Sequence, residues 1–170
     1  MTHKDDLRLA FSGKEIASER IALIESTAFE NETAEQFSRE RREKYQRLAE
    51  QSEKKISEIK SRIVEDIGAK QLQLDECENG VTQIETQYQL GELSYEELEK
   101  KVNATRKKCN KVKDEMNELQ HLFESSTSLG FGGRISIDID KDVDESGTIT
   151  KKPGLDLSKL SISNLLGRRF

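Results

Sequence analysis

Residues 89–98, QLGELSYEEL, decide the fold, because they interrupt the proline-free stretch that runs from residue 14 to residue 124. Gly91 suits the left-handed position just past a helix end. Ser94 and Glu97 have the spacing of a capping box, which would start a new helix at Tyr95. A connection as short as residues 91–94 usually joins antiparallel helices. The stretch therefore predicts the tip of a helical hairpin; the alternative is one continuous helix that tolerates Gly91.

Apolar side chains recur at helical spacing on both sides of this tip. They follow steps of three or four residues from Tyr45 to Ile67, and a strict 3-4 alternation from Tyr95 to Phe123. Such alternation is typical of a coiled coil. Seven basic residues in 100–113 would also face the mainly acidic stretch 70–86 across the hairpin, and opposite charges set the pairing of coiled coils. We predict an all-α fold, a long antiparallel coiled-coil helical hairpin with helices over residues 14–90 and 95–124.

The regions flanking the hairpin differ in composition. Residues 1–13 form a polar leader, and the Ser/Gly-rich stretch 125–133 is typical of a flexible linker. In the tail, residues 134–170, apolar isoleucines alternate with polar residues in GRISIDIDKDV, which predicts a short β segment. The aspartates of that stretch lack the glycine and glutamate of a calcium loop, so we interpret them as the outer face of a strand.

The composition argues against several classes of protein. With 36% charged and 5% aromatic residues, the chain suits solvated helices with one narrow apolar seam rather than a large core. The net charge of −5 gives no general attraction to nucleic acid, so nucleic acid is not an expected partner. Only two histidines are present, and no nucleophile, metal or phosphate-binding motif is evident. We expect no enzyme activity, no cofactor and no metal, and a cytoplasmic location, with attachment at a membrane surface as an alternative.

The two cysteines lie on the seam, in opposite helices of the hairpin. We expect free, buried thiols that act as small apolar side chains. The helix pairing leaves two registers open: opposing Tyr88 and Tyr95 sets Cys77 against Thr105, whereas opposing Tyr88 and Leu98 sets Cys77 against Cys109.

The second helix is too short to cover all of the first. It would reach back to about residue 60, leaving residues 14–59 as an arm with a bare apolar stripe, and such a stripe needs a partner. The simplest partner is a second copy, so we predict a homodimer or higher oligomer. The alternative is a disordered N-terminal third. The predicted self-association residues are Ile16, Ile21, Ile24, Phe37, Tyr45, Leu48 and Ile56.

The tail resembles a peptide ligand, because it carries apolar residues beyond a flexible linker. We predict that it binds another protein; the rival prediction is that it packs on its own coiled coil or on a neighbouring subunit. The predicted partner-binding residues are Ile135, Ile137, Ile139, Leu157, Leu160, Ile162, Leu165 and Leu166.

The stretch from Tyr88 to Phe123, with Gly91, Glu92, Leu93 and Ser94 at its tip, resembles the glycine-tipped hairpin of the CdvA-like coiled-coil family, the archaeal cell-division protein A family. The resemblance covers about residues 60–123. It implies a polymerising coiled coil whose C-terminal peptide recruits ESCRT-III-type proteins by adding a strand to a winged-helix domain. Residues 1–13 are too short for the β-barrel that the family carries at its N-terminus, so the membrane and nucleic-acid roles of that barrel are not carried over.

Together these features predict a non-enzymatic coiled-coil scaffold that self-associates into filaments and recruits a partner through its tail, in ESCRT-III-type cell division or membrane remodelling. The alternative is a discrete dimeric adaptor or regulator that binds a client protein through the hairpin.

Overall fold

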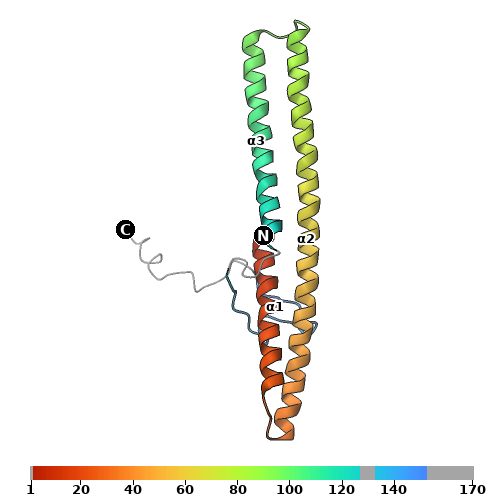
Figure 1. The fold of residues 1–170 in the computed structure, drawn as a ribbon, viewed down its shortest axis with the longest axis vertical. Helices are drawn as coiled ribbons and strands as arrows, with labels where there is room; N and C mark the ends of the chain where they lie inside the picture. The colour runs from red at the N-terminus through yellow and green to blue at the C-terminus, as the bar shows by residue number, and fades with distance from the viewer. Residues whose placement is uncertain (1, 127–132, 153–170) are drawn as a thin grey trace, which may run out of the picture. The chain divides into compact units, whose positions relative to one another are not determined.

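The chain forms three α-helices in a computed structural model that describes residues 2–126 and 133–152 (Figure 1). They are α1 (His3–Ser26), α2 (Glu32–Gln89) and α3 (Tyr95–Ser125). The described residues contain no strand, only one antiparallel bridge between Val143 and Ile149. The all-α class is confirmed, whereas the short β segment predicted in GRISIDIDKDV is not found among the described residues.

The chain divides into two compact units. Unit 1 contains α1, residues 32–59 of α2 and the segment 133–152; unit 2 contains residues 60–89 of α2 and α3. None of the helices in the described ranges is long and apolar enough to cross a membrane.

The first helix begins at His3, so the prediction that residues 1–13 form a leader is wrong. Thr2 is the N-cap, and its side chain accepts a hydrogen bond from the Asp5 N–H at 3.3 Å. Asp5 and Asp6 lie in the first turn, where negative charge interacts favourably with the helix dipole. Leu7 is fully buried, which shows that these residues contribute to the core.

A break at residues 27–31 divides the predicted helix 14–90 into two. Thr27 leaves the helical conformation with φ −98° and ψ 131°. Asn31 then caps α2, because its Oδ1 accepts a hydrogen bond from the Ala34 N–H at 2.8 Å. The break lets α1 run antiparallel beside the first half of α2, where Lys14 pairs with Glu53 and Glu25 with Arg42. Residues 14–59 are therefore not a bare arm.

α1 and α2 approach each other closely at Gly13. A Cβ atom placed there would lie 2.7 Å from both Ser52 Oγ and Ile149 Cδ1. Gly13 therefore marks a packing contact between α1 and α2. A glycine at this position lets the two helices and residue 149 meet without a clash.

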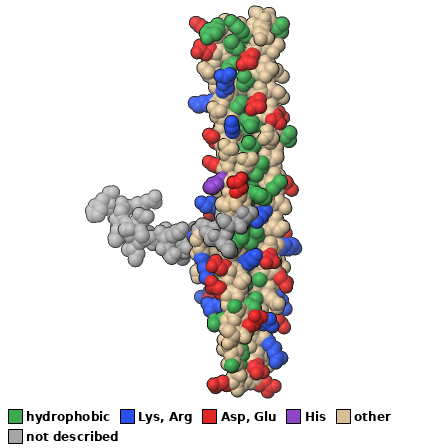
Figure 2. Space-filling view, in the orientation of Figure 1, with side chains coloured by type: hydrophobic (Ala, Val, Ile, Leu, Met, Phe, Trp, Pro, Cys, Tyr) green, Lys and Arg blue, Asp and Glu red, His purple; other side chains and the backbone are tan. Residues whose placement is uncertain are grey.

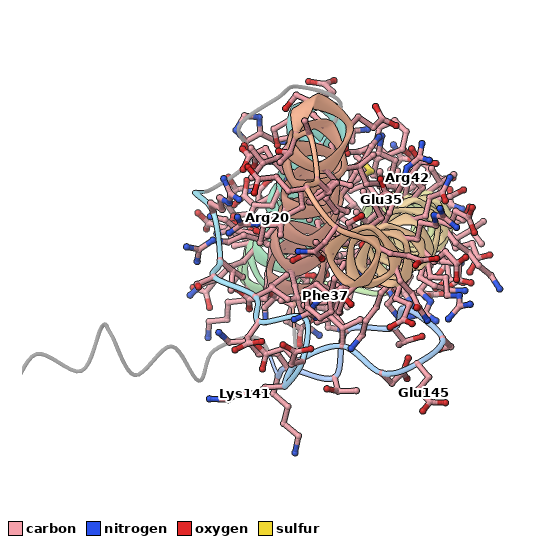
Figure 3. The ribbon with its side chains drawn as sticks, turned by 90° about the horizontal axis from the view of Figure 1, so that it is seen from below. Arg20, Glu35, Phe37, Arg42, Lys141 and Glu145 are labelled. Carbon is pink, nitrogen blue, oxygen red and sulfur yellow. A yellow bond between two sulfur atoms is a disulfide. The ribbon has the colours of Figure 1, made fainter. Side chains whose placement is uncertain are left out.

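The segment 133–152 lies along α1 and α2 (Figure 3). Its Ile139 and Val143 form one buried cluster with Ala17 of α1 and Leu48 of α2, with Ile137 and Ile149 packed beside them. Polar contacts fix its path: Ser12 Oγ accepts a hydrogen bond from the Ile135 N–H at 2.9 Å, and Arg8 Nε donates one to the Gly133 carbonyl at 2.9 Å. Arg134 and Glu19 form a two-bond ion pair.

Unit 2 is cross-linked by a disulfide between Cys77 of α2 and Cys109 of α3. The expectation of free thiols is therefore wrong. The cross-link corresponds to the register that sets Tyr88 opposite Leu98. Ion pairs between Lys70 and Glu115 and between Glu85 and Arg106 join the same two helices, and Leu74, Val102 and Met116 are buried. The Lys70 ammonium also lowers the pKa of Glu115 through their hydrogen bond.

Candidate protein-binding surfaces

The structure buries most of the predicted self-association residues within a single chain. Ile16, Leu48 and Ile56 are buried, and Ile21, Ile24 and Tyr45 are partly buried. Only Phe37 is largely exposed, at 58%, and Arg41 lies over its ring at 5.2 Å from the centroid. The premise that nothing in this chain covers the stripe is wrong, because α1 and the segment 133–152 cover it.

The predicted partner-binding residues fall into two groups. Ile135 and Ile139 are buried and Ile137 is partly buried in unit 1. The others, Leu157, Leu160, Ile162, Leu165 and Leu166, lie outside the described residues. For the isoleucines the structure shows the rival arrangement, in which this part of the tail packs on helices of its own chain.

The aspartates of the segment 133–152 are engaged with protein groups rather than with a common centre. Asp140 forms two hydrogen bonds with the Arg41 guanidinium, at 2.6 and 2.9 Å, which lowers the pKa of the carboxyl and raises that of the guanidinium. Asp144 Oδ1 accepts hydrogen bonds from Ser146 and from the Thr148 N–H, and these lower the pKa of Asp144. These carboxylates fix turns and helix contacts.

The connection between α2 and α3 is closed by backbone and side-chain hydrogen bonds at both helix ends. The Glu92 N–H donates to the Gln87 carbonyl and the Gly91 N–H to the Tyr88 carbonyl, each at 3.0 Å, with Gly91 at φ +76°. These are the two bonds of a Schellman motif. The predicted capping box is present: Ser94 Oγ accepts from the Glu97 N–H, and the Glu97 side chain accepts from the Ser94 N–H.

Three large apolar side chains are exposed on this connection. Tyr88 is 41% exposed, Leu90 70% and Tyr95 65%, and the two tyrosine rings meet edge to face with centroids 6.4 Å apart. We call these three residues the tip patch. Figure 2 shows hydrophobic side chains at the end of the α2–α3 pair, where Figure 1 places this connection.

The surroundings of the tip patch are acidic. Glu92, Glu96 and Glu99 are exposed, and residues 87–99 contain no lysine or arginine. The nearest cations in sequence are Lys100 and Lys101. The exposed charges next to the tip patch in sequence are therefore all negative up to Lys100. We missed the tip patch as a site in the sequence because Tyr88 and Tyr95 were assigned to the seam, although Leu90 at the turn was a signal of exposed apolar surface.

In the described ranges no group of three or more His, Cys, Asp or Glu residues is placed to hold a metal ion. Comparison with protein-family models, with curated proteins and with solved structures finds no match to this chain.

Proposed function

We propose that the chain is a non-enzymatic adaptor in which residues 60–125 form an antiparallel coiled-coil hairpin whose tip binds a client protein. The single observation that carries the proposal is the exposure of Tyr88, Leu90 and Tyr95 together on one connection. Tyrosines are enriched among the residues that dominate binding energy at protein interfaces. Exposed apolar residues gathered at one place mark interaction sites.

The fixed conformation of the connection supports this function. The Schellman motif and the capping box hold the backbone on both sides of Glu92. The disulfide joins the two helices behind it. A preorganised surface loses less conformational entropy on binding, so more of the contact energy appears as affinity.

The charge around the tip patch defines the kind of client. Glu92, Glu96 and Glu99 favour a partner whose apolar surface is bordered by lysine or arginine. Charges this exposed are screened by salt, so binding should weaken as ionic strength rises. The tip patch alone is smaller than a standard interface of about 800 Å² per partner. We therefore expect a transient complex, or one that also uses the flanking turns of α2 and α3.

The test is affinity capture from an extract of the cells that make this protein, with three full-length baits. The first is the wild type, and the second carries Tyr88→Ser, Leu90→Ser and Tyr95→Ser. The third is a control with Val64→Ser and Leu72→Ser, two residues of comparable exposure elsewhere on α2. We expect a protein that the wild type and the control retain and the tip variant loses at least tenfold. Equal retention by all three baits would refute the proposal.

A self-associating scaffold is the second candidate, favoured by the exposure of Leu23 (55%) and Phe37 (58%) in unit 1. In this function two chains would meet through that surface, and the tail would recruit a further partner, as in the assemblies of the family that the hairpin resembles. The substitutions Leu23→Ser and Phe37→Ser should then reduce the mass measured by light scattering. An unchanged mass would remove this candidate.

A further inference from the structure

The basic stretch of α3 pairs very little with α2. Seven lysines and arginines lie between residues 100 and 113, with no acidic residue among them. Within residues 2–126 and 133–152, only Arg106 of these seven forms an ion pair, with Glu85 at 4.0 Å. The ion pair between Lys70 of α2 and Glu115 of α3 has the opposite sense. The charge match predicted between the two helices therefore leaves the rest of this basic stretch unpaired in the described ranges.

Four of these lysines share the face of α3 that points away from α2. The inner face is fixed by Cys109, which belongs to the disulfide, and by Val102, which is buried. Positions two apart on a helix point in nearly opposite directions. Lys107 and Lys111 stand two positions from Cys109, and Lys100 stands two positions from Val102, so all three point outward. The exposed residues that we call the basic stripe are Lys100, Lys107, Lys108 and Lys111, which have the spacing of one helix face.

The basic stripe concentrates like charge at a cost to its own helix. Lys107 and Lys108 have no acidic residue three or four positions away on either side. Lys107 and Lys111 are four positions apart, and like charges at this spacing destabilise a helix. An anionic partner would relieve this repulsion, because opposite potentials meet across specific interfaces.

The basic stripe has a defined length. From Lys100 to Lys111 the helix rises about 17 Å, at 1.5 Å per residue. Glu96 lies four positions before the stripe and Glu118 seven positions after it, and both are exposed. Figure 2 shows basic side chains on this part of α3 between acidic side chains toward either end. A bilayer surface or a long nucleic acid lying along α3 would also meet these glutamates, and its own negative charge would repel them.

We propose that the basic stripe binds an acidic segment of another protein, short enough to cover the lysines without reaching the glutamates beyond them. An extended peptide rises about 3.3 Å per residue, so about six residues span the stripe. The contacts are exposed, so the complex should be weak and should dissociate as the salt concentration rises. The basic stripe is separate from the tip patch, and this inference is independent of client binding there.

Fluorescence anisotropy of a labelled decaglutamate peptide, titrated with the full chain in dilute buffer, tests the proposal. We expect saturable binding that weakens at least tenfold at about 150 mM salt, where the Debye length is about 8 Å. The test variant should bind the peptide at least tenfold more weakly than the wild type. It carries Lys100→Gln, Lys107→Gln, Lys108→Gln and Lys111→Gln. Glutamine has nearly the helix propensity of lysine, so this variant should keep the circular dichroism of the wild type.

The matched control makes the same change of net charge at four exposed lysines of unit 1 and should bind like the wild type. It carries Lys4→Gln, Lys54→Gln, Lys55→Gln and Lys141→Gln. The tip variant with Tyr88→Ser, Leu90→Ser and Tyr95→Ser should also bind like the wild type, which separates this result from client binding. No binding of the peptide, or an equal loss in both lysine variants, would overturn the proposal.

Two further probes separate carboxylates from phosphates. Vesicles that contain phosphatidylserine and a single-stranded decathymidylate should bind the full chain more weakly than decaglutamate does. If the basic stripe binds either probe more tightly than the peptide, the proposal of an acidic protein segment is wrong, because the stripe would then recognise phosphates.

Discussion

The disulfide should stabilise unit 2 by a free energy that depends on the length of the loop that it closes. Cys77 and Cys109 are separated by 32 positions, so the bond closes a loop of about 33 residues in the unfolded chain. The chain-entropy relation assigns about 3.7 kcal/mol at 25 °C to a loop of this length. Reduction should therefore lower the free energy of unfolding of unit 2 by about 3–4 kcal/mol.

Urea denaturation with and without a phosphine reductant measures this difference. Tyrosine fluorescence is the probe of choice, because the chain has no tryptophan and two of its three tyrosines, Tyr88 and Tyr95, lie at the tip of unit 2. Far-UV circular dichroism follows all three helices in parallel. The matched control is the double variant Cys77→Ser and Cys109→Ser, which should unfold at the same urea concentration whether or not reductant is present.

Counting thiols completes the test. Before reduction the denatured chain should take up no alkylating reagent, and after reduction it should take up two equivalents. Two reactive thiols in the untreated protein would refute the disulfide. A reductant effect below about 1 kcal/mol, in a sample shown to be oxidised, would refute the argument from loop closure.

Three further predictions concern unit 1 and the backbone of α2. Gly147→Ala should destabilise the packed segment 133–152 by at least about 2 kcal/mol in thermal unfolding, because Gly147 has φ +88° and a Cβ atom there would lie 2.4 Å from the Arg47 carbonyl carbon. Gly68→Ala, where a Cβ atom meets nothing within 4 Å, should instead stabilise the helix by about 1 kcal/mol, and equal effects of the two changes would contradict the packing described. Folding lowers the pKa values of Asp140 and Asp144. Their ionised carboxylates therefore stabilise the fold in full above the ordinary pKa of 3.8, and this stabilisation is lost as the pH falls through the lowered pKa values. Hydrogen exchange in segment 133–152, corrected for intrinsic rates, should therefore accelerate below about pH 4, and Asp140→Asn with Asp144→Asn should reduce that dependence.

The connection between α2 and α3 is predictable from the sequence, whereas the break between α1 and α2 is not. At residues 91–97 a glycine, a serine and a glutamate stand at the spacings that helix ends require, and each does what its position predicts. At residues 27–31 the signal was one asparagine, Asn31, whose side chain caps α2. A single capping residue inside a helix-forming sequence competes weakly with propensity, so the break was not recognised. Without the break, α1 is not expected as a separate helix that covers the first half of α2. The apolar stripe of residues 14–59 is then predicted to need a second chain.

The tail shows the limit of periodicity as a signal. Ile135, Ile137 and Ile139 alternate as in a strand, yet they belong to an irregular segment laid on two helices, whose backbone hydrogen bonds to side chains such as that of Ser12. Alternation predicts which side chains face the core, and it does so correctly for Ile135 and Ile139. It does not specify whether a neighbouring strand or a pair of helices supplies that core.

Unit 1 buries its own apolar stripe within one chain, and the proposed partner surface is the tip patch. The most direct test is the mass of the full chain by light scattering on a size-exclusion column, over a hundredfold range of concentration. We predict a constant mass near 19.4 kDa, that of one chain. A mass that grows with concentration, or a stable dimer that persists with Leu23→Ser and Phe37→Ser, would contradict the account, because the stripe would then be shared between chains.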